Sequence, residues 1–501
     1  MQTKYYRSFI KDNSVVIGGH ILVYMKSLII MPIIVKTVGV TIYGGFVLLA
    51  SLFGVAFGIS SFGAGFRAKR FMPSAKTMSE RRELFYPQFY FNLLIILILS
   101  VMFVLLRDPL NRVIFKHDIV FSIWIVPLYL TCYLLFSQGS DYFRYTSRVH
   151  YMTITALCFP YLHICFVLLY LYIFGSINID MLVISMSLSA LLVALPSFRV
   201  IIREIGVSFV WYKAANLIAD IKLGFPLVLG LILDFILAGS DRYLIAFYMS
   251  LADVGYYVPG YVLGSLIAFL PRAMGTAVPQ LISKAVDTNN EGEAHEMLNY
   301  AIKIFLLAAI PFIFATAALA KPILTLLANA EVAHRSQWVT PIVALGTAFY
   351  GLNIILSSIL FVRMRTFAIL KMNLSAAIFN LLTNAILLLV LTNIIVAAIT
   401  TFLSYLIAFV YITIQVRIVW PVSFQPLVIF KSIVASLLMA SMLFWAPFNT
   451  GGATTAIILA GKVLFGFATY ILCLFLLRTF TTTELRFMKA VLLNDALIRP
   501  N

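Results

Sequence analysis

Charged residues are scarce in this sequence. Asp, Glu, Lys and Arg make up 11% of the 501 residues, whereas hydrophobic residues make up 62%, and the mean hydropathy is +1.02. Soluble domains carry about 25% charged residues, which they need to cover their surface in water. The composition therefore excludes a soluble globular protein and predicts a polytopic membrane protein.

The motifs of soluble enzyme chemistry are also missing. The stretch GAGFRA (63–68) resembles a dinucleotide fingerprint, but it follows an apolar run and enters a basic loop instead of opening a strand-turn-helix unit. AGKVLF (460–465) lacks the upstream glycine and the following Ser or Thr of a phosphate-binding loop, and no G-x-S-x-G occurs. We therefore expect no bound cofactor and no enzyme activity.

Histidine and cysteine are few, and neither shows the spacing of metal ligands. The residues are His20, His117, His150, His163, His295 and His334, together with Cys132, Cys158, Cys165 and Cys473. Metal sites need such side chains at short, regular spacings, so we expect no metal. All four cysteines fall inside apolar runs, where we expect free thiols that behave as small hydrophobic side chains.

Long apolar runs make up most of the chain. A helix needs about 20 mostly apolar residues to cross a hydrocarbon core of roughly 30 Å, because lipid offers no partner for backbone amides. Runs of that length predict an all-α protein with about fourteen transmembrane helices, and their continuity excludes barrel strands. The expected spans are approximately 13–36, 41–64, 87–107, 119–139, 151–174, 180–200, 223–247, 254–280, 297–320, 339–362, 372–391, 394–416, 428–447 and 453–477.

Lys and Arg are unevenly divided between alternate loops. Most lie on one side, with clusters in 65–86 and 201–222. The other side has only Lys36, Arg107, Arg112, Lys116, Lys321 and Arg335. Because basic loops stay in the cytoplasm, we expect both termini to be cytoplasmic. The net charge of +17 then reflects topology and attraction to membrane lipids, and nucleic acid is not an expected partner.

The first apolar run follows a basic start, as in a secretory signal. It extends from Ser14 to Val35 and is followed by another apolar run. This length exceeds the apolar part of a signal peptide, so we expect a retained first span.

Charged residues inside the predicted spans are the candidate functional residues, because a charge at membrane depth costs free energy. Lys26 lies somewhat past the middle of the first span, and Asp234 lies near the middle of the seventh. Two interpretations stay open for this pair, a functional role and an internal structural salt bridge.

Other charges lie closer to the ends of the spans. Asp241 follows Asp234 two turns later on the same helix face, with Arg242 beside it, and Arg272 lies late in the eighth span. Asp241 and Arg242 either mark the membrane interface or take part in function. Lys462 in the last span is expected to extend its ammonium group to the interface.

An internal repeat connects the first and seventh spans. IKDNSVVIGG, which starts at Ile10, resembles IKLGFPLVLG, which starts at Ile221. A glycine follows the lysine of each segment at the same distance, Gly44 in the first copy and Gly255 in the second. The surrounding residues match as well, VTIYGGFV in the first copy and LADVGYYV in the second.

The repeat predicts the organisation of the chain. Equal numbers of spans separate the copies, so we expect two six-helix lobes related by a parallel repeat, followed by two C-terminal helices. Parallel repeats with a site at their interface are a transporter architecture. The expected domains are an N-terminal lobe (1–205), a C-terminal lobe (206–420) and a final segment (421–501).

Three stretches carry a family resemblance. They are YGGFVLLASLFGVAFGISSFGAG (43–65), LGFPLVLGLILDFILAGSDRYLIAFYMSLADVGYYVPGYVLGSL (223–266) and PQLISKAVDTNNEGEAHEMLNYAIKIFLLAAIPF (279–312). The chain resembles the polysaccharide flippases of the multidrug/oligosaccharidyl-lipid/polysaccharide exporter superfamily, the Wzx type that moves O-antigen, capsule or exopolysaccharide repeat units. The Asp-Arg pair followed by Asp-Val-Gly-Tyr is the most specific element.

The resemblance implies two lobes around a cavity that opens alternately to the two sides. Its implied substrate is undecaprenyl-pyrophosphate-linked oligosaccharide, carried from the cytoplasmic to the periplasmic leaflet of the inner (plasma) membrane, where the resemblance places the protein. A pyrophosphate needs compensating cations in the membrane, and we expect Lys26 and Arg272, and less centrally Lys303, to supply them. The expected energy source is a proton, sodium or the membrane potential, and the polysaccharide polymerase machinery is an expected partner.

Asp234 is the expected coupling residue. We expect it to neutralise Lys26 when the substrate is absent, and to bind a proton or sodium once the pyrophosphate takes over the lysine. Asp241 and Arg242 would then form an outer gate or interface pair.

Two alternatives stay open. A cation-coupled multidrug exporter of the same superfamily is expected to have twelve spans and a more acidic cavity. A membrane-embedded polysaccharide polymerase or glycosyltransferase is expected to carry a large extracytoplasmic loop, whereas the outward loops 108–118 and 321–338 are short.

Overall fold

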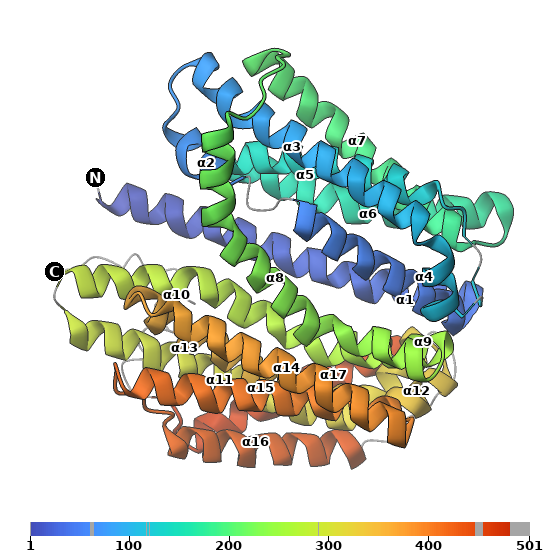
Figure 1. Ribbon diagram of the computed structural model, residues 1–501. Coiled ribbons are helices and arrows are strands. Elements are labelled where there is room, and N and C mark those ends of the chain that lie inside the picture. Colours follow the sequence, from blue (N-terminus) through green and yellow to red (C-terminus); the bar gives the residue numbers. More distant parts are fainter. Residues whose placement is uncertain are drawn as a thin grey trace. The chain divides into compact units, whose positions relative to one another are not determined.

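The computed structural model describes residues 2–60, 65–116, 118–119, 121–288, 290–445 and 454–480. All regular secondary structure in these residues is helical (Figure 1), as the continuous apolar runs predict. The elements are α1 (Gln2–Ser60), α2 (Phe66–Phe71), η1 (Met72–Ser74), α3 (Met78–Leu105), α4 (Arg107–Val113), α5 (Ile125–Tyr145), α6 (Val149–Phe174), α7 (Ile179–Ile205), α8 (Ala214–Tyr248), α9 (Leu251–Gly264), η2 (Ser265–Ala268), α10 (Phe269–Asp287), α11 (Glu291–Leu327), α12 (Ala330–Ser336), α13 (Val339–Val362), α14 (Thr366–Leu391), α15 (Ile394–Arg417), α16 (Pro426–Trp445) and α17 (Thr454–Leu476).

Twelve helical segments of the described chain are long and apolar enough to cross a membrane, fewer than the approximately fourteen predicted from the sequence. One difference is α1, which joins the predicted first and second spans. Gly39 interrupts it with φ 86° and ψ 172°, a conformation that glycine adopts without a steric penalty. The other difference is α5, which covers most of the predicted span 119–139 but ends in the polar stretch SQGSDYFRY. These residues lower its mean hydropathy.

Residues 1–262 and 369–408 form one compact unit. Within it, α5 packs against α3, α6 and α7, and α1 packs against α6 and α8 (Figure 1). Buried aromatic side chains fill the contact between α3 and α5, where the rings of Phe85 and Tyr142 meet edge to face with centroids 5.5 Å apart. The contact between α3 and α5 therefore has an aromatic core.

Residues 263–368 and 409–501 form a second compact unit. Here α11 packs against α10, α13, α16 and α17. Its buried core includes Leu319 of α11, Met439 of α16 and Leu474 of α17. The predicted division into 1–205, 206–420 and 421–501 stays a prediction.

Two glycines mark the crossing of α1 and α9. A Cβ atom on Gly44 would collide with the carbonyl oxygen of Leu251, and one on Gly255 would collide with the carbonyl oxygen of Val40. Gly44 and Gly255 are equivalent in the sequence repeat, and so are Val40 and Leu251. The contact is therefore reciprocal, which is the pattern that a twofold relation between two copies produces.

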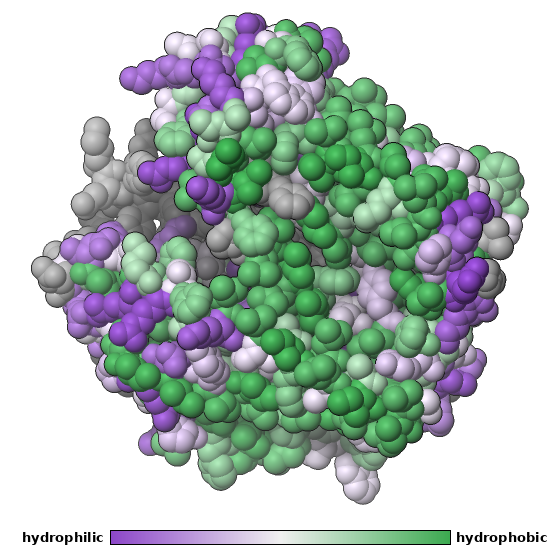
Figure 2. Space-filling model, in the orientation of Figure 1, coloured by the Kyte–Doolittle hydropathy of each residue, from purple (hydrophilic) through white to green (hydrophobic). Residues whose placement is uncertain are grey.

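Large apolar side chains are exposed along the helices. On α3, Leu97, Ile98 and Val101 point away from the protein interior, and Ile386 and Leu389 do so on α14. Figure 2 shows hydrophobic residues over most of the visible face, with hydrophilic residues gathered toward the ends of the helices. This distribution fits helices whose middle parts lie in hydrocarbon.

Candidate functional site

The Asp241–Arg242 pair of α8 forms a buried polar network. Asp241 is 1% exposed, and its Oδ2 accepts a hydrogen bond of 2.5 Å from the hydroxyl of Tyr257 on α9. Its Oδ1 accepts a bond of 2.8 Å from the backbone N–H of Arg242. The guanidinium carbon of Arg242 lies 5.0 Å from the ring centroid of Tyr261, also on α9. A buried carboxylate needs such partners, because an uncompensated one would cost several kcal/mol.

The next residue of α8 fastens this network to α1. The Tyr243 hydroxyl donates to the carbonyl oxygen of Leu48 at 2.9 Å and shares a hydrogen bond of 2.8 Å with the Ser51 hydroxyl. The ring of Phe235 packs against Tyr243, with centroids 5.8 Å apart. The sequence element with the strongest family resemblance therefore joins three helices, α1, α8 and α9.

Lys26 lies in an aromatic environment on α1. Its Nζ is 5.5 Å from the ring centroid of Phe159 on α6, a cation–π contact. His163, one turn later on α6, is buried, and its ring centroid is 6.1 Å from that of Phe46. Asp234 lies on α8 with an exposed side chain. The pairing of Lys26 with Asp234 stays a prediction.

The other predicted cations belong to the second compact unit. Arg272 on α10 is exposed, and its guanidinium carbon lies 5.8 Å from the ring centroid of Tyr350 on α13. Lys303 on α11 is buried, which is unusual for a lysine, so it is a candidate substrate-binding residue. Lys462 on α17 is half-buried.

Lys303 lines an apolar groove of about 670 Å³. The groove runs along α11 and is closed by α16 and α17, and its walls include Leu307, Phe312, Leu319, Met439, Phe467 and Tyr470. The Tyr470 hydroxyl donates to the carbonyl oxygen of Leu307 at 2.8 Å, and this bond fixes α17 to α11. The groove therefore combines a long apolar surface with one cationic side chain.

A buried cluster of uncharged polar residues joins α8, α14 and α15. The Asn380 Oδ1 accepts from the hydroxyl of Ser240 at 3.3 Å and from the amide of Asn384 at 3.4 Å. The Thr400 hydroxyl donates to Asn384 Oδ1 at 2.7 Å, and the Asn380 amide donates to the Thr401 hydroxyl at 3.4 Å. The sequence interpretation missed this cluster because it considered charged residues only. Two asparagines one turn apart in an apolar span were the available signal.

Metal and disulfide chemistry have no visible basis in the described part of the chain. No group of His, Cys, Asp and Glu there is arranged to hold a metal ion. Cys132, Cys158, Cys165 and Cys473 are free thiols.

Several solved structures share the fold of this chain. A lipid II flippase, MurJ, in an inward closed conformation gives a TM-score of 0.68 at 16% identity, over 93% of this chain and 98% of the flippase. A multidrug resistance MATE family transporter of the MOP superfamily, inward-facing, gives 0.63 at 13% identity, over 78% and 95%. The Vibrio cholerae MATE transporter VcmN gives 0.58 at 13% identity, over 83% and 98%. The chain therefore has the fold that this lipid II flippase and these MATE transporters share.

Two sequence families match parts of this chain. Residues 9–279 match the family described as "Polysaccharide biosynthesis protein", and residues 226–386 match the MatE family. The first match covers more than half of the sequence, and the chain belongs to the polysaccharide biosynthesis protein family. No curated protein matches significantly. The expectation of a transporter of this superfamily, and not an enzyme, is confirmed.

Proposed function

We propose that the protein is a flippase for polysaccharide repeat units linked to undecaprenyl pyrophosphate, which it moves from the cytoplasmic to the periplasmic leaflet. The observation that carries this proposal is the apolar groove with Lys303 in its wall, in a chain of the polysaccharide biosynthesis protein family. A lipid-linked oligosaccharide has a long isoprenoid tail and an anionic pyrophosphate. The apolar walls suit the tail, and the buried lysine suits the anion.

The groove also favours a lipid-linked substrate over a drug. Two of its walls, α16 and α17, lie beyond residues 226–386, the region that matches the MatE family. The two MATE transporters above cover 78% and 83% of this chain, whereas the lipid II flippase covers 93%. A multidrug exporter of the same superfamily is nevertheless the second candidate, because the MatE match and the MATE structures support it.

The proposed mechanism assigns roles to the charged residues. Lys26, Arg272 and Lys303 hold the pyrophosphate, and Asp234 couples transport to a proton, to sodium or to the membrane potential. Alternating access then carries the substrate across. Asp241 and Arg242, held by Tyr257 and Tyr261, act as a gate or interface pair where α8 and α9 meet α1. The proposed setting is the inner membrane, with both termini in the cytoplasm and with α5 and the two parts of α1 counted among fourteen spans.

Filling the groove tests the proposal. Ala315 lines the groove, whereas Ala317 lies on the same helix with an exposed side chain. Ala315→Trp places an indole where the lipid tail would lie, and Ala317→Trp is the matched control. Both variants and the natural protein are reconstituted into liposomes, and translocation of undecaprenyl-pyrophosphate-linked oligosaccharide is followed by a glycosidase added outside. Export of a cationic dye is measured in parallel.

We expect the natural protein and Ala317→Trp to translocate the oligosaccharide and Ala315→Trp to lose at least tenfold in rate. A tenfold loss in rate corresponds to an increase of about 1.4 kcal/mol in the activation free energy of translocation. Dye export without oligosaccharide translocation would overturn the proposal in favour of the multidrug exporter. Equal translocation by both tryptophan variants would remove the groove from the mechanism.

A further inference from the structure

The segment between α7 and α8 is an extended strap, residues 206–213. Three side chains on one face of α3 hold the end of α7 and the first part of the strap. Arg82 Nε donates to the carbonyl oxygen of Ile205, the Tyr86 hydroxyl donates to that of Gly206, and the Tyr90 hydroxyl donates to that of Ser208 at 3.1 Å. Arg82, Tyr86 and Tyr90 are spaced one helical turn apart, so they form a row along α3. The strap is therefore fixed in place without a secondary structure of its own.

Side chains of the strap alternate between the two sides. Val207 and Phe209 are 75% and 79% exposed, and Trp211 is exposed at the rim of the pocket described below, which it also lines. Ser208, Val210 and Tyr212 alternate with these residues and line the pocket described below, and the Tyr212 hydroxyl donates a hydrogen bond of 3.2 Å to Asp220 Oδ2. The strap connects the ends of two candidate spans, α7 and α8, so we expect it to lie at the level where membrane and water meet. Exposed aromatic side chains at that level are typical of contact with lipid.

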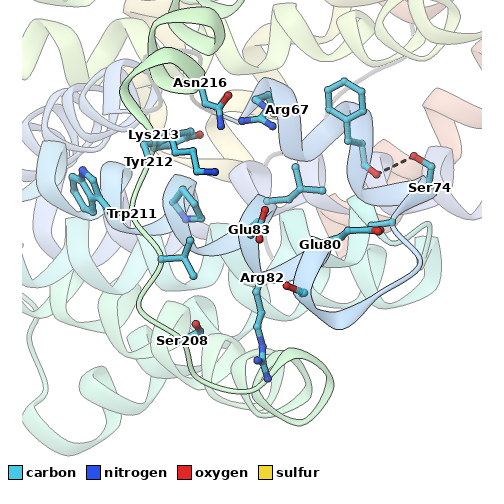
Figure 3. Close-up of a pocket in the computed structure, with 16 residues that line it drawn as sticks. Arg67, Ser74, Glu80, Arg82, Glu83, Ser208, Trp211, Tyr212, Lys213 and Asn216 are labelled. Atoms are coloured by element: carbon cyan, nitrogen blue, oxygen red, sulfur yellow. Dashed lines mark hydrogen bonds between the residues drawn. The ribbon is translucent and has the colours of Figure 1, made fainter.

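A pocket of about 600 Å³ lies between the strap and the connection from α1 to α3. Figure 3 shows Arg67, Lys213 and Asn216 toward one end of the pocket, with Glu83 further along its wall. The charge of Arg67 also acts on Tyr212 of the strap. Burial raises the pKa of Tyr212, the nearby Asp220 carboxylate adds to this rise, and Arg67 opposes it.

Two other charged residues of the pocket, Glu80 and Arg82, form hydrogen bonds within the protein. Glu80 closes the capping box of α3, accepting from the backbone N–H groups of Lys76 at 2.9 Å and Thr77 at 3.5 Å. Arg82 holds the strap. The charges that face the pocket apart from these are two cations, Arg67 and Lys213, and one carboxylate, Glu83.

We propose that this pocket binds a glycerophospholipid whose headgroup carries both a phosphate and a primary ammonium, as in phosphatidylethanolamine. Arg67 and Lys213 pair with the phosphate, Asn216 adds an amide donor, and Glu83 accepts hydrogen bonds from the ammonium. The acyl chains leave the pocket over the exposed apolar side chains of the strap, which a soluble phosphoethanolamine would not use. The inference does not depend on the substrate proposed above.

Native mass spectrometry of the full-length protein in detergent tests the proposal. The protein is titrated with phosphatidylethanolamine, phosphatidylglycerol and phosphatidylcholine of the same acyl chains. Lys213→Ala removes one phosphate partner, and Glu83→Gln removes the ammonium partner at an exposed position where folding is not at risk. Arg203→Ala is the matched control, because Arg203 is an exposed cation at the end of α7 that does not line the pocket.

We expect Lys213→Ala to weaken phosphatidylethanolamine binding about tenfold, the size of one charge-assisted hydrogen bond, and Arg203→Ala to leave it unchanged. Glu83→Gln should weaken phosphatidylethanolamine and strengthen phosphatidylglycerol, so that the preference between the two lipids falls about tenfold. Phosphatidylcholine, whose ammonium has no N–H donor, should bind more weakly than phosphatidylethanolamine.

Three results would overturn the proposal. Identical lipid binding by Lys213→Ala and Arg203→Ala would show that no phosphate lies in the pocket. An unchanged preference between phosphatidylethanolamine and phosphatidylglycerol in Glu83→Gln would exclude the ammonium. Displacement of the lipid by an equal concentration of glycerophosphoethanolamine, which lacks acyl chains, would identify a soluble ligand in place of a lipid.

Discussion

Removing one hydroxyl from the buried network on α8 should destabilise the protein by an amount that the structure defines. Tyr257→Phe keeps the ring and deletes only the O–H that donates to Asp241 Oδ2 at 2.5 Å. The carboxylate is 1% exposed, so water cannot replace the lost donor. Hydrogen bonds to buried charged groups contribute about 1.5–3 kcal/mol, and we expect a loss of this size in the free energy of unfolding.

Equilibrium unfolding in mixed micelles measures this loss. Tyr172→Phe is the control, because Tyr172 is 90% exposed on α6, and we expect it to change stability by less than about 0.5 kcal/mol. Asp241→Asn removes the charge that balances Arg242, and we expect a loss of about 3–5 kcal/mol. The double variant should lose less than the sum of the two single variants, because Asp241→Asn already weakens the charge-assisted bond that Tyr257→Phe deletes. Equal stability of Tyr257→Phe and Tyr172→Phe, or strict additivity with Asp241→Asn, would refute the reasoning.

Four further predictions concern other parts of the molecule. Gly255→Ala should lower the free energy of unfolding by about 1–3 kcal/mol, because the added methyl group would collide with the backbone of α1. Gly230→Ala is the control, because the space around its added methyl group is open, and equal unfolding curves of the two variants would contradict the prediction. Lys26→Ala should abolish a surface polysaccharide at normal protein abundance, and a normal surface glycan would contradict its role in pyrophosphate binding. Asp234→Asn should lose ion-driven transport in proteoliposomes, and full ion dependence would contradict its role in coupling. Cysteine labelling should reach the 321–338 loop only from outside, and cytoplasmic labelling there would invert the topology.

The class of protein and the positions of the helices could be predicted from the sequence because both depend on local properties. Continuous hydrophobicity marks a helix in lipid wherever it occurs, so the predicted spans agree with the helices of the structure except at α1 and α5. The kink at Gly39 was not predicted, because a single glycine in an apolar run can also continue a helix.

Partners of the charged residues could not be predicted. The sequence placed Asp241 and Arg242 on one helix end, but the turn between α8 and α9 decides that Tyr257 faces the carboxylate. Likewise the aromatic neighbour of Lys26, Phe159, comes from a helix far along the chain. The groove beside Lys303 depends on how α16 and α17 pack, and no local pattern encodes such a contact.

The reciprocal glycine contact allows the two copies of the repeat to be compared as natural variants of one another. In the register set by Gly44 and Gly255, the first copy replaces the buried network of the second with apolar residues. The counterparts of Asp241, Arg242 and Tyr257 are Ile30, Met31 and Phe46, and all three are buried. The two copies of the repeat therefore carry charged and polar side chains in one case and apolar side chains in the other, at equivalent positions. Because apolar replacement of a whole buried ion network is often neutral or stabilising, packing alone does not explain why the second copy carries these charges.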